Sequence, residues 1–149
     1  MSSLKSYRSL KVNNIKIIFD GQTIKFNLFK ELAINEDRLD KEIKNQPSYY
    51  GFLLLIQKKL LTKFENLKQD RKRLYAKLYL QAKKKTTNGR PYNDDMAKAY
   101  VEAHPQYVSI TKNCIIAKDE ADTIYSCIKA FEQRKDLIQT LSSNNRKNF

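Results

Sequence analysis

The chain has 149 residues and carries 29 Lys or Arg against 16 Asp or Glu, which gives a formal net charge of +13 and a pI near 9.7. No stretch of about eighteen apolar residues is present, which excludes a membrane-spanning helix. The first ten residues lack the apolar segment of a secretory signal, so we expect a cytoplasmic protein with no membrane partner. Three Gly, three Pro and a mean hydropathy of −0.67 favour long helices with narrow apolar stripes.

The residue types needed for catalysis or metal binding are scarce. Cys114 and Cys127 stand thirteen positions apart on one predicted helix, about 20 Å at 1.5 Å per residue, which is too far for a disulfide. The single histidine, His104, precedes Pro105 at a predicted helix end, where a capping role is expected and no Cys/His metal cluster can form. Neither a P-loop nor a G-x-G-x-x-G turn occurs. We therefore predict a non-enzymatic protein with buried thiols and with no cofactor or metal.

The first predicted element in chain order is a β-hairpin over residues 15–28. Asp20-Gly21 is its turn dipeptide, because both central positions of a type I′ turn need positive φ. Counting outward from the turn puts apolar residues on one face, with the pairs Phe19–Gln22, Ile17–Ile24 and Ile15–Phe26. Two strands alone are marginally stable in water, so this face should pack on a helix or on a second subunit.

Two helices should follow, separated by a proline. Asn35 is a suitable N-cap, with acidic residues after it, for a short helix that ends near Asn45. Pro47 then fits the first position of a long helix that meets no breaker before a loop at residues 86–91. An apolar heptad row with companion residues runs along this helix: Leu53, Leu60, Leu67 and Leu74, with Ile56, Phe64 and Leu78.

After the loop, Asn93 should cap a short helix that ends at His104, and a second long helix follows Pro105. Its heptad rows are Tyr107, Cys114, Ala121 and Ile128, with Ile110, Ala117, Ile124, Phe131 and Ile138. We therefore predict a mainly α fold, an antiparallel, coiled-coil-like helical hairpin with a small N-terminal β-hairpin. The expected division is 1–46 for the β-hairpin and short helix, 47–146 for the two-helix hairpin with a connector near 86–105, and 147–149 for a tail.

The positive charge is concentrated in one segment. Residues 47–90 hold twelve Lys or Arg and only two acidic residues, whereas the rest of the chain is close to balanced. A cationic helix of this kind is typical of a polyanion binder, because each neutralised phosphate releases condensed counterions. Tyrosines alternate with lysines along one flank, which suits single-stranded nucleic acid with unstacked bases. The candidate binding residues are Lys58, Lys59, Lys68, Arg71, Lys72, Arg73, Tyr75, Lys77, Tyr79, Lys83, Lys84, Lys85 and Arg90.

Other interpretations of this segment stay open. The charged face could be merely solvated, with Tyr75 and Tyr79 padding the edge of the coiled coil, and cations near a helix C-terminus also complement its macrodipole. Arg71 and Lys85 interrupt the seam side of the helix, and an unpaired Arg buried in a closed two-helix seam would be costly. We therefore expect the helical hairpin to assemble into a homo-oligomer.

The run from Arg71 to Leu78, RKRLYAKL, lies in the middle of the long basic helix before a Gly-containing break. It resembles the corresponding region of phage recombination mediators of the UvsY type, in which a basic-Ala-basic-Leu stretch occurs. The run from Phe131 to Leu141, with Arg146 beyond it, resembles the ends of small helical proteins of tailed phages. The resemblance covers roughly residues 45–146. The β-hairpin lies outside it, and Tyr75 stands where the family tends to have a cation.

The resemblance implies an all-helical, ring-forming protein that binds single-stranded DNA and helps to load a recombinase onto strands covered by single-strand-binding protein. Carried over to this sequence, it makes Lys72, Arg73 and Lys77 the expected DNA contacts, in the host cytoplasm if a phage encodes the protein. DNA and RNA both remain possible ligands. Two other functions remain candidates: a structural or virion-associated coiled-coil oligomer, and a small inhibitor or adaptor with a cationic face.

Overall fold

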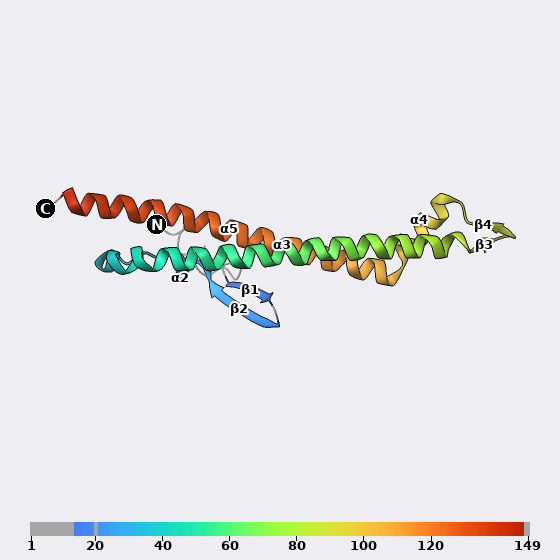
Figure 1. The fold of residues 1–149 in the computed structure, drawn as a ribbon, viewed down its shortest axis with the longest axis horizontal. Coiled ribbons are helices and arrows are strands. Elements are labelled where there is room, and N and C mark those ends of the chain that lie inside the picture. Colours follow the sequence, from blue (N-terminus) through green and yellow to red (C-terminus); the bar gives the residue numbers. More distant parts are fainter. Residues whose placement is uncertain (1–13, 20, 148–149) are drawn as a thin grey trace, which may run out of the picture. The chain divides into compact units, whose positions relative to one another are not determined.

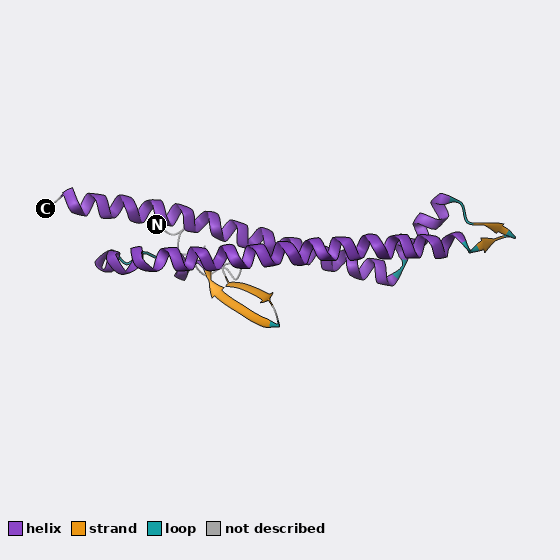
Figure 2. Cartoon of the chain, viewed as in Figure 1, coloured by secondary structure: helices purple, strands orange, loops and turns teal. Residues whose placement is uncertain are grey.

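The structure is a computed structural model, and it describes residues 14–19 and 21–147. Its elements in chain order are β1 (Asn14–Phe19), β2 (Gln22–Asn27), α2 (Leu28–Leu32), the 3-10 turn η2 (Glu36–Arg38), α3 (Leu39–Lys83), β3 (Thr86–Thr87), β4 (Arg90–Pro91), α4 (Asp94–Ala103) and α5 (Pro105–Lys147) (Figure 1). Helices dominate, and β1 and β2 form a small antiparallel hairpin near the N-terminus (Figure 2). The predicted fold class is therefore confirmed.

The chain divides into two compact units, and both long helices contribute to each of them. The first unit comprises the described residues through Lys59 together with those from Asp122 onward, and the second unit comprises Leu60–Ala121. This division differs from the expected boundary between residues 46 and 47. It arises because each half of α3 packs against a part of α5 that is distant in the sequence.

The N-terminal hairpin, in the first unit, has the predicted register. Its pairs include Phe19–Gln22, Ile17–Ile24 and Ile15–Phe26. Gly21 has a φ of 74°, which the predicted turn requires, while its neighbour Asp20 lies outside the described residues. Ile15 and Ile17 are buried, whereas Ile18 on the other face is 55% exposed. One face of the hairpin is therefore buried within the first unit, as expected because two strands alone are only marginally stable in water.

Pro47 does not begin a helix. Asn35 caps η2 as predicted, its side chain accepting a hydrogen bond of 3.1 Å from the backbone N–H of Asp37. From Leu39, however, the chain continues as one helix through Pro47 to Lys83, so the predicted break near Asn45 is wrong. A proline inside a helix removes a backbone hydrogen bond and costs about 3 kcal/mol. Contacts on either side of Pro47 must outweigh that cost.

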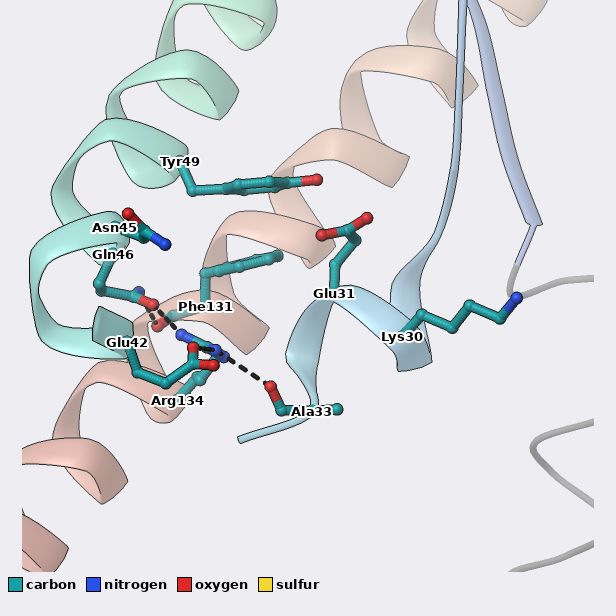
Figure 3. Close-up of a pocket in the computed structure, with 9 residues that line it drawn as sticks. All are labelled: Lys30, Glu31, Ala33, Glu42, Asn45, Gln46, Tyr49, Phe131 and Arg134. Carbon is teal, nitrogen blue, oxygen red and sulfur yellow. Dashed lines mark hydrogen bonds and ion pairs between the residues drawn. The ribbon is translucent and has the colours of Figure 1, made fainter. Parts of the chain in front are cut away.

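Those contacts centre on Arg134 of α5, which is only 9% exposed (Figure 3). Its guanidinium donates hydrogen bonds to four acceptors, which are the carbonyl oxygens of Leu32 and Ala33 and the side chains of Gln46 and Glu42. A buried guanidinium is tolerated when a carboxylate and further acceptors compensate it in this way. The cluster therefore fastens the end of α2 and the first turns of α3 to α5.

Aromatic rings cover the same cluster. The ring of Tyr49 stacks on that of Phe131, with centroids 5.1 Å apart and planes 12° from parallel. Burial, and then a hydrogen bond with the Glu31 carboxylate, raise the pKa of Tyr49 to about 12. Gln46 donates from its side chain to the Phe131 carbonyl oxygen at 3.1 Å. The polar groups thus satisfy one another around a cavity of about 240 Å³, and we assign the cluster a structural role.

In the second unit, α3 and α5 pack antiparallel along the predicted seam. Lys63 pairs with Glu120 at 3.5 Å, and the Tyr75 ring meets the edge of Tyr107 with centroids 5.8 Å apart. The buried residues of this unit are Leu60, Leu78, Ala82, Ala97, Val101, Cys114, Ala117 and Ala121. The heptad residues Phe64, Leu67 and Leu74 are only half-buried. The seam is therefore less completely closed in its middle.

The predicted loop at 86–91 contains a second hairpin. Thr86 pairs with Pro91 and Thr87 with Arg90. Asn88 and Gly89 have φ values of 50° and 73°, and two positive φ values are what a type I′ turn needs. Asn-Gly is a strong hairpin signal, which our prediction of a plain loop did not use.

The residues predicted to cap α4 and α5 do so. Asn93 caps α4 by accepting a hydrogen bond of 2.8 Å from the backbone N–H of Met96. The Nδ1 atom of His104 accepts one of 3.2 Å from the backbone N–H of Gln106, so the histidine caps the start of α5. Cys114 and Cys127 are both free and buried, as expected.

We predict that the two faces of β1 differ sharply in their contribution to stability. Ile17→Ala should lower the free energy of unfolding by about 2–5 kcal/mol, because it deletes buried methyl groups and leaves a cavity. Ile18→Ala, the same change on the exposed face, should cost less than about 0.5 kcal/mol. Urea unfolding followed by circular dichroism measures both values. Equal stability of the two variants would show that the hairpin does not pack on the helices.

Candidate nucleic-acid interface

Several of the candidate cations have partners within their own unit. Lys68 pairs with Glu65 at 3.2 Å and Arg73 with Asp70 at 3.4 Å, both between residues three apart on α3. All four side chains are well exposed. Ion pairs of this kind contribute about 0–1 kcal/mol and are readily exchanged for other partners. Lys68 and Arg73 therefore remain available to an external anion.

Another set of cations is exposed and has no ion pair or hydrogen bond of its side chain to any described residue. This set is Lys59, Lys72, Lys77, Lys84 and Arg90. Lys59 belongs to the first unit and the others to the second. Arg73 lies one helical turn before Lys77, so these two cations share one flank of α3. Lys84 follows directly after the last residue of α3 and adds its charge at that end of the helix.

The two tyrosines of the opposite flank are packed against other side chains. Tyr75 and Tyr79 are half-buried and stack on one another, with centroids 6.2 Å apart and planes 15° from parallel. The Tyr79 hydroxyl also donates a hydrogen bond of 2.7 Å to Asp94. Both rings thus have partners within the second unit. This agrees with the alternative that Tyr75 and Tyr79 pack at the edge of the coiled coil. Only part of each ring is left for a base.

Asp94, in the first turn of α4, gathers two of the candidate residues. Its carboxylate accepts hydrogen bonds from Tyr79 and, at 2.9 Å, from the Lys83 ammonium, which also donates to the Tyr92 carbonyl oxygen at 3.2 Å. Hydrogen bonds from Lys83 and Tyr79 hold the pKa of Asp94 below its usual value. The same contacts raise the pKa values of Lys83 and Tyr79. Lys83 is therefore neutralised internally, unlike its neighbour Lys84.

Lys85 differs from its predicted place on the seam. The helix α3 ends at Lys83, and the exposed Lys85 side chain lies with its ammonium 4.9 Å from the ring centroid of Tyr100. A cation over an aromatic face is weakly attractive, which holds Lys85 beside α4. Arg71, in contrast, lies on the seam side as predicted and is half-buried.

The described residues contain no group of three or more His, Cys, Asp or Glu side chains able to hold a metal ion. Within that same part of the chain, none of the helices has an apolar stretch that would let it cross a membrane. Asp94 is the residue of this surface that sequence reasoning missed. Its spacing to Lys83 and Tyr79 carries no periodic signal, because the β3–β4 hairpin brings α4 back to α3.

No model of a known protein family matches the chain, and no curated protein matches it either. Among solved structures, it is similar to the crystal structure of the bacteriophage T4 recombination mediator protein UvsY, with a TM-score of 0.68. The match covers 82% of this chain and 96% of that one, at 15% sequence identity. At this identity the likeness shows the fold. The resemblance to UvsY-type proteins is thus confirmed at the level of the fold.

We predict that Lys83, more than any other cation, sets the ionisation of Asp94. Lys83→Met should raise the pKa of Asp94 toward its usual value, Tyr79→Phe should do so less, and Lys84→Met should leave it unchanged. Because the pKa is depressed in the folded state, the pair stabilises the protein above the unfolded pKa, and this is lost as the pH falls through the folded pKa. NMR titration of the side-chain carboxyl reports each value. The same pKa in the Lys83→Met and Lys84→Met variants would contradict this assignment.

Proposed function

We propose that this protein is a non-enzymatic recombination mediator of phage type that binds single-stranded DNA through the basic part of α3. The observation that carries the proposal is the structural similarity to UvsY, a recombination mediator, over most of both chains. A fold alone does not determine function. The proposal therefore also needs a surface that suits the ligand, and the cations of α3 and of the segment that follows it to Arg90 supply one.

The charge balance of α3 supports this choice of ligand. Between residues 47 and 90 the only acidic residues are Glu65 and Asp70, and each already faces one cation. Lys72, Lys77, Lys84 and Arg90 make no ion pair with a described residue, so each can neutralise a phosphate and release the counterions condensed on the nucleic acid. We propose that these four residues, with Arg73, carry most of the binding. Tyr75 and Tyr79 contribute base stacking on the parts of their rings that remain uncovered.

The mediator function implies protein partners, which we also propose here. A mediator of this type acts with a recombinase and a single-strand-binding protein in the host cytoplasm, and it assembles into a homo-oligomer. Exposed apolar residues support assembly. In the second unit they include Leu61, Leu80, Val108, Ile115 and Ile116. Such residues on a two-helix unit mark surfaces that a further copy can cover.

A structural coiled-coil protein is the second candidate, and one observation favours it. Tyr75, Tyr79 and Lys83 make contacts within the second unit, as expected for side chains that stabilise the helix packing and do not bind a ligand. Such a protein would also form an oligomer, so mass alone does not separate the two functions. Binding to an oligonucleotide does.

We predict an oligomer in solution. Light scattering at micromolar concentration should give a mass several times the 17.5 kDa of one chain. The exposed apolar residues of the second unit should be its main contacts, so Leu80→Gln together with Ile115→Gln should lower the mass. A monomer at high concentration would contradict the homo-oligomer.

We further predict salt-dependent binding of a short oligothymidine. With four phosphate contacts per protomer, the logarithm of the affinity should fall with the logarithm of the salt concentration with a slope of about −3. Replacing Lys72, Lys77 and Lys84 by Gln should reduce the size of that slope by about 2. The matched control replaces Lys25, Lys41 and Lys44, three exposed cations of the first unit, and should leave the slope unchanged.

Circular dichroism must show the same helix content in both triple variants. Equal oligonucleotide affinity of the parent and the Lys72/Lys77/Lys84 variant at low salt would contradict the mediator and favour the structural protein. An equal loss in both triple variants would mean that net charge, rather than the surface formed by Lys72, Lys77 and Lys84, attracts the strand.

A further inference from the structure

The outer edge of β1, in the first unit, presents backbone groups without a partner among the described residues. Phe19 and Gln22 flank a two-residue turn and therefore form a hydrogen-bonded pair, and such pairs alternate with non-hydrogen-bonded pairs along a hairpin. The N–H and C=O groups of Asn14, Lys16 and Ile18 therefore point away from β2. The described part of this sheet has only two strands, and no other described residue forms a backbone hydrogen bond with these groups.

An open edge of this kind can accept a further strand, and β1 suits this better than β2. The strand β2 runs directly into α2, and the side chain of its last residue, Asn27, caps that helix (Figure 1). The strand β1 instead carries Ile18, whose side chain is 55% exposed. A third strand beside β1 would cover part of Ile18 and pair the outward backbone groups at the same time.

Lys16 restricts the kind of strand that fits. It lies directly opposite Lys25 on the exposed face of the hairpin, and neither side chain makes an ion pair with a described residue. Like charges directly opposite one another destabilise a strand pair. Both lysines also line a cavity of about 440 Å³, so there is unfilled space beside them. An acidic side chain in that space would relieve the repulsion.

Lysines on an edge strand also protect proteins against unwanted pairing. Lys16 has this effect on basic strands, including β1 of a second copy, which would bring a further lysine to the same edge. The same charge attracts an acidic strand, so it selects among partners. The outward backbone groups and the exposed Ile18 favour a protein strand over a nucleic acid, which offers no backbone N–H groups for strand pairing.

We propose that the edge of β1 is a docking site for an extended acidic segment of a partner protein, which adds as an antiparallel third strand. In that arrangement the partner residue opposite Ile18 stands two positions before the residue opposite Lys16. The segment therefore reads apolar, any residue, acidic, with the apolar and acidic side chains on the exposed face. The site goes beyond the proposed function, because it uses the hairpin and none of the candidate nucleic-acid residues.

The first test is hydrogen exchange at single amides, measured by NMR. In the free protein the amide of Ile17 should be protected by its bond to β2, and the amides of Lys16 and Ile18 should exchange rapidly. The end-capped peptide Thr-Val-Thr-Glu-Thr-Thr-Thr, at about 1 mM, should slow the exchange of Lys16 and Ile18 about tenfold, as expected for a Kd of about 0.1 mM. The same peptide with Lys in place of Glu should not.

Two N-methylated peptides distinguish strand addition from charge attraction alone. A methyl group on the Glu nitrogen removes an N–H that would bond to β1, whereas one on the nitrogen of the preceding Thr removes an N–H on the far side of the added strand. The two peptides have the same composition and charge. Only the second should protect Lys16 and Ile18. Equal protection by both peptides would overturn strand addition.

Two protein variants test which strand receives the peptide. Lys16→Glu should weaken binding of the Glu peptide about fivefold and strengthen binding of the Lys peptide by a similar factor. Lys25→Glu should change both affinities less, because β2 is one strand further from the added segment. Both variants replace the Lys–Lys pair by a Glu–Lys pair, so their effects on the hairpin itself are matched. A larger effect of Lys25→Glu would place the segment on β2 and contradict our assignment.

The remaining outcomes identify other occupants, and each of them overturns the proposal. Protection of Lys16 and Ile18 that grows with protein concentration, without peptide, would mean that a second copy fills the edge. Protection at every concentration would mean that the chain covers its own edge. Protection by oligothymidine and not by the Glu peptide would mean that the two lysines attract nucleic acid. Unchanged exchange with about 1 mM Glu peptide would mean that the edge accepts no acidic strand.

Discussion

The seam between α3 and α5 is narrow, and this constraint governs the rest of the structure. In each unit only the seam and the elements lying directly on it can bury side chains, so a polar residue there must find a partner or remain unsatisfied. Arg134 in the first unit has four acceptors from two segments of the chain, the end of α2 and the first turns of α3. Arg71 in the second unit has none among the described residues. The contrast separates a guanidinium that holds the fold together from one that is available to a ligand.

The same narrowness leaves most of the helix surface to water, and charge decides how that surface is used. In the second unit, Asp94 neutralises Lys83, and Glu65 and Asp70 partly neutralise their neighbours. Lys72 and Lys77 of α3 face solvent and make no ion pair with a described residue. A fold shared with UvsY does not by itself require such a surface, so the fold and the charge distribution are separate lines of support.

Local patterns predicted their elements well. The register of β1 and β2 follows from a two-residue turn and an alternating sequence, and the caps at Asn35, Asn93 and His104 each depend on bonds within three residues. The prediction failed at Pro47, because the contacts that keep the helix intact reach it from Phe131 and Arg134, more than eighty positions away.

Part of the candidate surface could be predicted from the sequence. The net charge of residues 47–90 can be counted directly along the chain, and this count identified the basic part of α3. Which cations are neutralised was not predictable. That depends on Asp94, which the β3–β4 turn returns to α3. How far Tyr75 and Tyr79 are covered was not predictable either, because it depends on their stacking on one another and on the edge contact of Tyr75 with Tyr107.

The antiparallel register also orders the folding of the chain. Contacts near the β3–β4 hairpin close short loops, nine positions for Lys83 with Tyr92 and 15 for Tyr79 with Asp94. Lys63 with Glu120 spans 57 positions, and Gln46 with Phe131 spans 85. Closing a long loop in one step costs more entropy than extending a loop already closed nearby. Pairing should therefore begin beside the β3–β4 hairpin and propagate like a zipper, so that the Arg134 cluster forms last.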